Sequence, residues 1–224
     1  MSGDIRPVAV LPIKDMVDAK QRLSAALSPE ERRGLFAAMA EDVLAALAGA
    51  PVLAGVLVVT RDPAAAALAA RHGAEVWREP ANRGQTPAVM DAIRLLASRG
   101  VAATISIPAD VPLITADEVA AVVAAHRPAP SVTIAPAHDR LGSNAMLCSP
   151  PTILELRFGD ASFEPHVAQA RALGIEPTLV PLPGLGLDVD HPRDLAAFAA
   201  RPSPTRAYAY LREQGILARL AAWA

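Results

Sequence analysis

Three aspartates stand where apolar runs of this sequence end. Asp110 directly follows VAATISIPA, and Asp188 and Asp190 lie one valine apart at the end of LGLDVD. A carboxylate at the border of a core must be hydrogen-bonded, ion-paired or bound to a metal. Residues two apart on a strand share a face, so Asp188 and Asp190 would repel each other unless a cation lay beside them. Carboxylate oxygens suit Mg²⁺, which makes the three aspartates candidate metal ligands and catalytic residues.

Each member of the pair has a different structural alternative. Asp190 or His191 could cap a helix that begins at Pro192, because proline is favoured at the first helical position. Asp188 has no such alternative role. The sequence therefore predicts that Asp188 is the aspartate on which the chemistry depends most.

Basic residues gather after the first apolar run, where Lys14, Lys20 and Arg22 fall within nine positions. Apolar residues in this segment do not have helical spacing. Cations in a loop after a strand suit the charge of a polyphosphate, although a charged surface loop would explain them as well. No P-loop and no GxGxxG dinucleotide fingerprint is present, so those two nucleotide folds are unsupported.

Polar residues in two further segments could bind an anion. In FGDASFEPH, Gly159 permits a turn and Ser162 stands at a predicted helix start, where free backbone N–H groups and the helix dipole favour negative charge. Ser143 and Asn144 add a hydroxyl and an amide at the start of a predicted strand. His166 is either a phosphate contact or a packing histidine. Together with the carboxylates and the cations, these groups suit metal-assisted phosphoryl or nucleotidyl transfer.

The elements that must position these residues alternate along the chain. Capping boxes at Ser28/Glu31 and Thr115/Glu118 mark two helix starts. Strands are predicted at 6–13, 53–60, 74–78, 101–108, 131–136, 143–148, 176–181 and 185–190. Helices are predicted at 29–49, 63–72, 86–98, 116–126, 162–173, 192–200 and 204–224. This order predicts one α/β domain over residues 1–224, with a mostly parallel, partly mixed sheet, helices on both faces and a C-terminal helical extension at 204–224. Ligands of such sheets bind beyond the carboxyl ends of the strands.

Composition narrows the class of protein. A hydrophobic content of 52% with 20% charged residues indicates a globular chain, and a formal net charge of −2 gives no reason to expect binding to nucleic acid or to an anionic membrane. The single cysteine, Cys148, lies in an apolar run and is interpreted as a buried thiol. No signal-peptide pattern and no apolar stretch long enough for a membrane span is found, so a cytoplasmic protein is expected. The oligomeric state is left open, a homodimer included.

Six motifs in order resemble one known family over about residues 7–200. They are PIK…AKQRLS, AMAEDVLAAL, ADVPLI, SNAML, FGDASFEPH and LDVDHPRDL. The family is CofC/FbiD, guanylyltransferases that make the activated phospho-acid precursor of coenzyme F-420. The resemblance implies a nucleotide-diphospho-sugar transferase (GT-A-like) fold, which agrees with the α/β prediction.

The resemblance also implies roles for single residues. Asp110, Asp188 and Asp190 would bind Mg²⁺, two ions being expected, and Lys20 would join them as a catalytic residue. The GTP triphosphate would lie against Lys14, Lys20 and Arg22, and the phospho-acid against Ser143, Asn144, Gly159, Ser162 and His166. A phosphate oxygen of the acid would attack the α-phosphorus of GTP and expel pyrophosphate. That oxygen is already ionised at neutral pH, so no protein base is required.

The chain departs from the family pattern in three motifs. Ser143 stands where threonine is usual, His191 replaces the threonine after the aspartate pair, and the third departure is the largest. Where the family reads G-L-N-x-A-L, this chain has Gly84-Gln85-Thr86-Pro87-Ala88-Val89, so Gly84 and Thr86 are the implied nucleoside contacts although the usual asparagine is missing. Phosphoenolpyruvate, 2-phospho-L-lactate and 3-phosphoglycerate are the candidate acids, with phosphoenolpyruvate preferred.

Other readings of the same fold fit the sequence less well. A molybdopterin guanylyl- or cytidylyltransferase would carry a glycine-rich first loop, which LPIKDMVDAK is not. A glycosyltransferase would carry D-x-D where this chain reads Asp110-Val111-Pro112. A non-catalytic homologue would have lost the carboxylates or the cations, and both sets are present.

Overall fold

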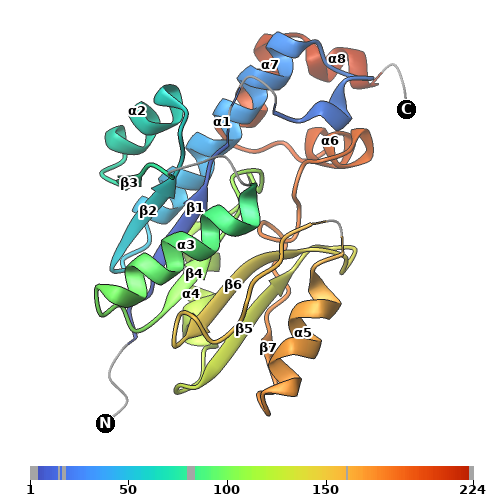
Figure 1. The fold of residues 1–224 in the computed structure, drawn as a ribbon. Helices are drawn as coiled ribbons and strands as arrows, with labels where there is room; N and C mark the ends of the chain where they lie inside the picture. Colours follow the sequence, from blue (N-terminus) through green and yellow to red (C-terminus); the bar gives the residue numbers. More distant parts are fainter. Residues whose placement is uncertain (1–4, 15, 17–18, 80–83, 160, 222–224) are drawn as a thin grey trace.

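The computed structural model describes residues 5–14, 16, 19–79, 84–159 and 161–221. At its centre is a seven-stranded mixed sheet with the strand order β3-β2-β1-β4-β6-β5-β7 (Figure 1). The strands are β1 (Val8–Pro12), β2 (Gly55–Val59), β3 (Glu75–Trp77), β4 (Thr104–Ser106), β5 (Ser131–Pro136), β6 (Ser143–Ser149) and β7 (Thr178–Leu179).

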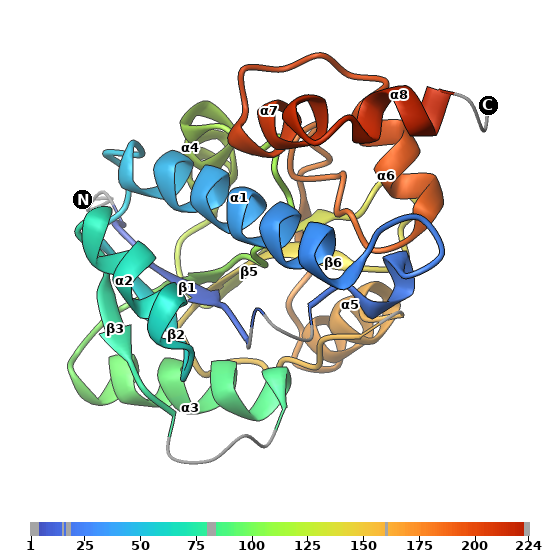
Figure 2. The ribbon, with the colours of Figure 1, turned by 90° about the horizontal axis from the view of Figure 1, so that it is seen from above.

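Helices cover both faces of this sheet (Figure 2). On one face α1, α2 and α4 pack together with the C-terminal helices, and on the other face lie α3 and α5. The helices are α1 (Pro29–Ala48), α2 (Pro63–Arg71), α3 (Gln85–Ser98), α4 (Ala116–Ala124), α5 (Phe163–Ala172), α6 (Pro192–Ala199), α7 (Arg206–Glu213) and α8 (Ile216–Ala221), with a short 3₁₀ turn at Gln21–Leu23. The α/β fold class predicted from the sequence is confirmed.

Strand β1 shows why the sheet has two cores. Ala9 and Leu11 are buried in the cluster that contains α1, whereas Val10 is buried in the cluster that contains α3. A parallel strand covered on both faces needs apolar residues at every position, which explains the continuous apolar run in the sequence.

Strand β6 decides which residues can meet at the site. It pairs antiparallel with both β4 and β5, while the other described pairs in the sheet are parallel. The amino end of β6 therefore lies at the same edge of the sheet as the carboxyl ends of β1 and β4. Ser143 and Asn144 open β6, so its reversal carries them to the edge at which Asp110 follows β4.

Two predicted elements are wrong. Residues 185–190, predicted as a strand, have no strand structure, because their backbone bonds go to scattered partners and not to a neighbouring strand. The helix predicted at 204–224 is divided into α7 and α8 at Gly215, whose φ of 67° is one that L side chains rarely adopt. The end of that prediction, residues 222–224, lies outside the described residues.

The C-terminal helices pack against the long helix α1. The carboxylate of Asp42 accepts hydrogen bonds from the backbone N–H groups of Arg206 and Ala207, so α1 caps the start of α7. Arg219 Nη2 lies 2.8 Å from Glu31 Oε1, and this ion pair links α8 to the start of α1. The described part of the C-terminal extension thus packs against α1 of its own chain. Among the described residues, no helix combines the length and apolarity needed to cross a bilayer.

Candidate active site

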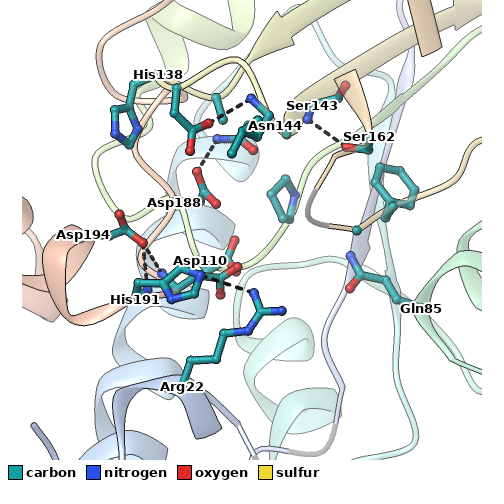
Figure 3. Close-up of a pocket in the computed structure, with 18 of the residues that line it drawn as sticks. Arg22, Gln85, Asp110, His138, Ser143, Asn144, Ser162, Asp188, His191 and Asp194 are labelled. Carbon is teal, nitrogen blue, oxygen red and sulfur yellow. Dashed lines mark hydrogen bonds between the residues drawn. The ribbon is translucent and has the colours of Figure 1, made fainter. Parts of the chain in front are cut away.

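Two adjoining cavities open where β1, β4 and β6 meet, and Asp110 and Asp190 line both. One, of about 330 Å³, is lined by Ser143 and Ser162 and is called the hydroxyl cavity here (Figure 3). The other, of about 480 Å³, is called the cation cavity, and its basic lining residues are Lys14, Lys20 and Arg22. Residues predicted from five separate segments thus line two adjoining cavities.

The Lys20 ammonium lies between two of the three aspartates. Its Nζ is 2.5 Å from Asp110 Oδ2 and 2.6 Å from Asp190 Oδ1, and the Lys20 side chain is only 5% exposed. Burial alone would lower the pKa of Lys20, but the two carboxylates outweigh burial and raise it. Burial would likewise raise the pKa of Asp190, but the Lys20 charge outweighs it and holds that pKa below its usual value. Lys20 is therefore charged and ion-paired at neutral pH.

Asp188 is held by a different partner. Asn144 Nδ2 donates to Asp188 Oδ1 at 3.0 Å (Figure 3) and also to the Leu185 carbonyl, at 2.8 Å. Burial raises the pKa of Asp188, and the negative charges of Asp110 and Asp190 raise it further. Asn144 was predicted as a substrate contact. Both of its amide protons are donated to acceptors within the protein, and one of these bonds orients Asp188.

The segment that carries Asp188 and Asp190 is fixed although it is not a strand. Both oxygens of Glu118 accept backbone N–H groups, from Gly184 at 2.7 Å and from Leu185 at 2.9 Å. The predicted capping box of α4 is thus half formed, because Thr115 caps the helix while the Glu118 carboxylate faces this segment. A Cβ on Gly184 would stand 2.2 Å from the Leu113 carbonyl oxygen, so this close approach requires glycine.

At the carboxyl end of this segment, the Asp190 side chain does not cap the helix that begins at Pro192, which was the structural alternative for this residue. His191 is the N-cap residue of α6, as one of the two alternatives predicted, and Asp194 Oδ2 accepts its backbone N–H at 2.7 Å and that of Asp190 at 3.2 Å. The Asp190 carboxylate is not the cap and instead faces Lys20. Arg22 lines both cavities, and its Nη1 lies 3.5 Å from Nε2 of His191, which lines the hydroxyl cavity.

The hydroxyl cavity is built on a buried hydrogen-bonded chain. The backbone N–H of Ser143 donates to Ser162 Oγ at 3.1 Å, which joins the start of β6 to the start of α5 (Figure 3). Gly159 also lines this cavity. His166 does not line it: this side chain is 1% exposed behind Ser143, with both ring nitrogens hydrogen-bonded.

The start of α3 differs from what the family pattern implied. Thr86 Oγ1 accepts the backbone N–H of Phe158 at 3.0 Å and ties α3 to the loop before α5. Its neighbour Gln85 lines both cavities, and Gly84 is the residue before the helix.

Sequence reasoning missed Gln85, and it also missed His138 and Arg193, which line the hydroxyl cavity. The position of Gln85 in the first turn of a helix that follows a strand is the one signal that could have identified it. His138 and Arg193 carry no such local signal.

The three aspartates are oxygen donors of the kind that hold a divalent metal ion. Among the residues described, no group of three or more histidines, cysteines or acidic residues is placed to hold a metal ion, and Lys20 Nζ lies between two of the predicted ligands. One oxygen of the set, Asp110 Oδ1, is nevertheless buried without a hydrogen-bond partner in the described part of the chain. Such an oxygen, beside two further carboxylates, fits a hard divalent cation that would compete with the Lys20 ammonium.

Comparison with known proteins places the chain among nucleotidyl transferases. A sequence model of the family described as "Guanylyl transferase CofC like" matches residues 8–221. A phosphoenolpyruvate guanylyltransferase of Sphaerobacter thermophilus is 38% identical over 86% of this chain and 92% of its own length. A 2-phospho-L-lactate guanylyltransferase of Methanothermobacter thermautotrophicus is 34% identical over 93% of this chain and 91% of its own.

A solved structure supports the fold independently. A protein from Desulfovibrio desulfuricans G20, provisionally assigned as a nucleotide-diphospho-sugar transferase, superposes with a TM-score of 0.77 over 96% of this chain and 97% of its own. At 17% identity this likeness shows the fold alone. The predicted nucleotide-diphospho-sugar transferase fold is confirmed.

Proposed function

Because this chain belongs to the CofC-like guanylyl transferase family, we propose that it joins GTP to a small phospho-acid and releases pyrophosphate. The observation that carries this proposal is the meeting of two unlike cavities at Asp110 and Asp190. A cation-lined space suits a triphosphate, and a space lined by hydroxyls at a helix start suits a smaller anion. The shared wall is where the two substrates would react.

The side chains support distinct tasks in this reaction. Lys14, Lys20 and Arg22 would bind the triphosphate, while Ser143 and Ser162 would bind the phospho-acid. A phosphate oxygen of the acid would attack the α-phosphorus of GTP, the bond from that phosphorus to the bridging oxygen would break, and pyrophosphate would leave. The protein needs no general base for this step, because the attacking oxygen is ionised at neutral pH.

Mg²⁺ is part of the proposal. Asp110, Asp188 and Asp190 are the residues that would hold it, and the buried, unpartnered Asp110 Oδ1 supports this role. When bound, the ion would offset negative charge on the phosphate oxygens of the two substrates.

We propose that the acid is phosphoenolpyruvate and that the reaction is a step in the biosynthesis of coenzyme F-420. Two relatives that are 38% identical to this chain are named phosphoenolpyruvate guanylyltransferases, and they support this choice. The relative from Methanothermobacter thermautotrophicus, which is named a 2-phospho-L-lactate guanylyltransferase, is 34% identical. A molybdopterin nucleotidyltransferase is not favoured, because the family match covers residues 8–221.

The direct test is a matrix of substrates with the purified protein and Mg²⁺. Each of the four nucleoside triphosphates is combined with phosphoenolpyruvate, 2-phospho-L-lactate or 3-phosphoglycerate, and pyrophosphate release is measured. We expect the fastest release with GTP and phosphoenolpyruvate. Absence of pyrophosphate with every pair would contradict the proposed function, and a faster pair would correct the substrate.

A further inference from the structure

His166 is buried between the backbone of one loop and the hydroxyl of Ser143. The backbone N–H of Arg157 donates to His166 Nε2 at 3.0 Å, and His166 Nδ1 lies 3.0 Å from Ser143 Oγ. A nitrogen that accepts a hydrogen bond carries no proton, so in the neutral ring the proton is on Nδ1. Burial lowers the pKa of His166 to about 4, so the ring is neutral at physiological pH. His166 therefore donates to Ser143.

The direction of this bond determines what the Ser143 hydroxyl can offer. Its oxygen already accepts from His166, just as Ser162 Oγ accepts the backbone N–H of Ser143. Within the described residues neither hydroxyl has an acceptor for its own proton. Both serines are 5% exposed and line the hydroxyl cavity. Two hydroxyl protons are thus left for a ligand in that cavity.

The loop that sets the tautomer is itself held in place. The backbone N–H of Phe158 donates to Thr86 Oγ1 at 3.0 Å, and the Phe158 ring packs edge-on against His166 with centroids 5.9 Å apart. The opposite tautomer would point an Nε2–H at the Arg157 N–H, and this is unfavourable because two donors would face each other with no acceptor between them. The backbone therefore selects the Nδ1–H form.

We propose that His166 is a positioning residue, which acts through Ser143 and fixes that hydroxyl as a hydrogen-bond donor toward the phospho-acid. The inference rests on the proposed function and extends it to selectivity. At this part of the wall both serine hydroxyls have only a proton to offer, so it accepts the anionic oxygens of a carboxylate or phosphate and disfavours a ligand group that is itself a donor, such as an amide.

Two variants separate the two hydrogen bonds of the ring. The amide nitrogen of His166→Asn can reach the position of Nδ1 and still donate to Ser143, whereas the amide oxygen of His166→Gln can reach the position of Nε2 and still accept from Arg157. We expect His166→Gln to raise KM for the phospho-acid about 10-fold with KM for GTP unchanged, and His166→Asn to raise it far less. Equal KM values in the two variants would overturn the proposal.

A second buried histidine provides the matched control. His126 lies at the opposite end of β6, where its ring contacts Thr133 Oγ1 at 2.8 Å and Ser149 Oγ at 2.7 Å, and burial lowers its pKa to about 4 as well. His126→Gln should lower the melting temperature and leave both KM values unchanged. A KM effect of the same size in this variant would show that loss of any buried histidine suffices, and would overturn the proposal.

A double-mutant cycle and a spectroscopic measurement complete the test. If His166 acts through Ser143, then His166→Gln adds no further rise in KM to the Ser143→Ala variant, whereas multiplying effects would contradict the mechanism. In ¹⁵N spectra of the ligand-free protein, Nδ1 of His166 should have the shift of a protonated nitrogen and Nε2 that of an unprotonated one. The reverse assignment would overturn the proposal.

These readouts separate two kinds of failure. If wild-type protein releases pyrophosphate but His166→Gln leaves KM unchanged, the positioning role is wrong and the proposed function stands. If wild-type protein releases no pyrophosphate with any substrate pair, the proposed function is wrong, and the ¹⁵N spectrum still decides whether His166 donates to Ser143.

Discussion

The cation cavity and the hydroxyl cavity differ in how they present polar groups to a ligand. In the first, the groups stand on long basic side chains, of which Lys14 and Arg22 are exposed. In the second, Ser143 and Ser162 are neutral, short and nearly buried, and a chain of hydrogen bonds inside the protein orients them. The cation cavity therefore offers a ligand positive charge, and the hydroxyl cavity offers it hydrogen-bond donors of fixed orientation.

The shared wall shows how the two are connected. Asp110 and Asp190 face the cation cavity through Lys20, while Asp188 faces the hydroxyl cavity through Asn144. Charge interactions tolerate small displacements, whereas hydrogen bonds weaken steeply with angle. Substitutions on the two sides should therefore have different effects on activity, substrate KM and stability. The following predictions test that difference, from the largest expected effect to the smallest.

Removing the charge of Asp188 should have the largest effect. We expect Asp188→Asn to lower kcat/KM for pyrophosphate release roughly 10³-fold, because it removes a negative charge aimed at the reacting groups. Its fold, followed by circular dichroism, should be unchanged, since burial and two like charges make ionised Asp188 unfavourable in the free protein. Asp117→Asn, an exposed acid on α4, is the control and should keep full activity. Substantial turnover by Asp188→Asn would refute its assigned role.

Removing the Lys20 charge should affect both stability and activity. Lys20→Met leaves two carboxylates without their ion pair, and we expect a loss of about 1–3 kcal/mol in the free energy of unfolding, less than for a fully buried pair because Asp190 is 39% exposed. Activity should fall about 10²-fold. Mn²⁺ should bind the substrate-free variant more tightly, because the competing ammonium is gone. Arg33→Met, on the exposed side of α1, is the control.

The Lys20 effect should depend on pH in a defined direction. The lowered pKa of Asp190 means that its ion pair stabilises the fold above the ordinary aspartate value of 3.8 and that this contribution is lost as the pH falls through the lowered pKa. The raised pKa of Lys20 preserves the pair on the alkaline side up to and beyond 10.5. Urea unfolding should therefore show a difference between wild type and Lys20→Met at pH 7 that becomes smaller as the pH is lowered below 3.8. A pH-independent difference would contradict the ion pair.

Loosening the segment that carries the aspartates should have an intermediate effect. Glu118→Gln replaces one of two acceptor oxygens with a donor that faces a backbone N–H, and we expect a loss of about 1–3 kcal/mol in stability and about 10-fold in kcat/KM. Urea unfolding and pyrophosphate release measure the two. Glu213→Gln, exposed at the end of α7, should change neither. Wild-type behaviour of Glu118→Gln would mean that this clamp does not position the aspartates.

An exposed cation should matter least. We expect Lys14→Gln to raise KM for GTP about 3-fold with little change in kcat, because a solvent-exposed charge is largely screened. The difference from wild type should shrink further in high salt, while KM for the phospho-acid stays the same. Arg71→Gln on α2 serves as the control. A change confined to KM for the phospho-acid would invalidate the division between the cavities.

Local signals predicted most of the fold. The Ser28/Glu31 capping box is formed, and the apolar strands and alanine-rich helices lie close to their predicted bounds. The two errors have physical reasons. In residues 185–190 the apolar side chains Leu185, Leu187 and Val189 alternate as in a strand, but the backbone bonds of this segment go to Glu118, His138 and Asp110 instead of a strand. The C-terminal helix breaks at Gly215, a signal that the apolar spacing concealed.

The site was predictable as a set of residues and not as a set of contacts. The three aspartates and the three cations were identified because charged groups beside apolar runs need partners. Their pairing was not identifiable, because Lys20 and Asp190 are 170 positions apart and only folding brings them together. For the same reason the partners of Asn144, Thr86 and His166 could not be read from the sequence.

The sequence by itself determined the order of strands and helices and the residues available at the strand ends, because apolar period, capping and turn residues act over a few positions. Only the tertiary structure decided that β6 runs against its neighbours, that Lys20 lies between Asp110 and Asp190, and that a backbone N–H sets the tautomer of His166. Those facts depend on the direction of individual bonds between distant segments, and that direction exists only after the segments have packed.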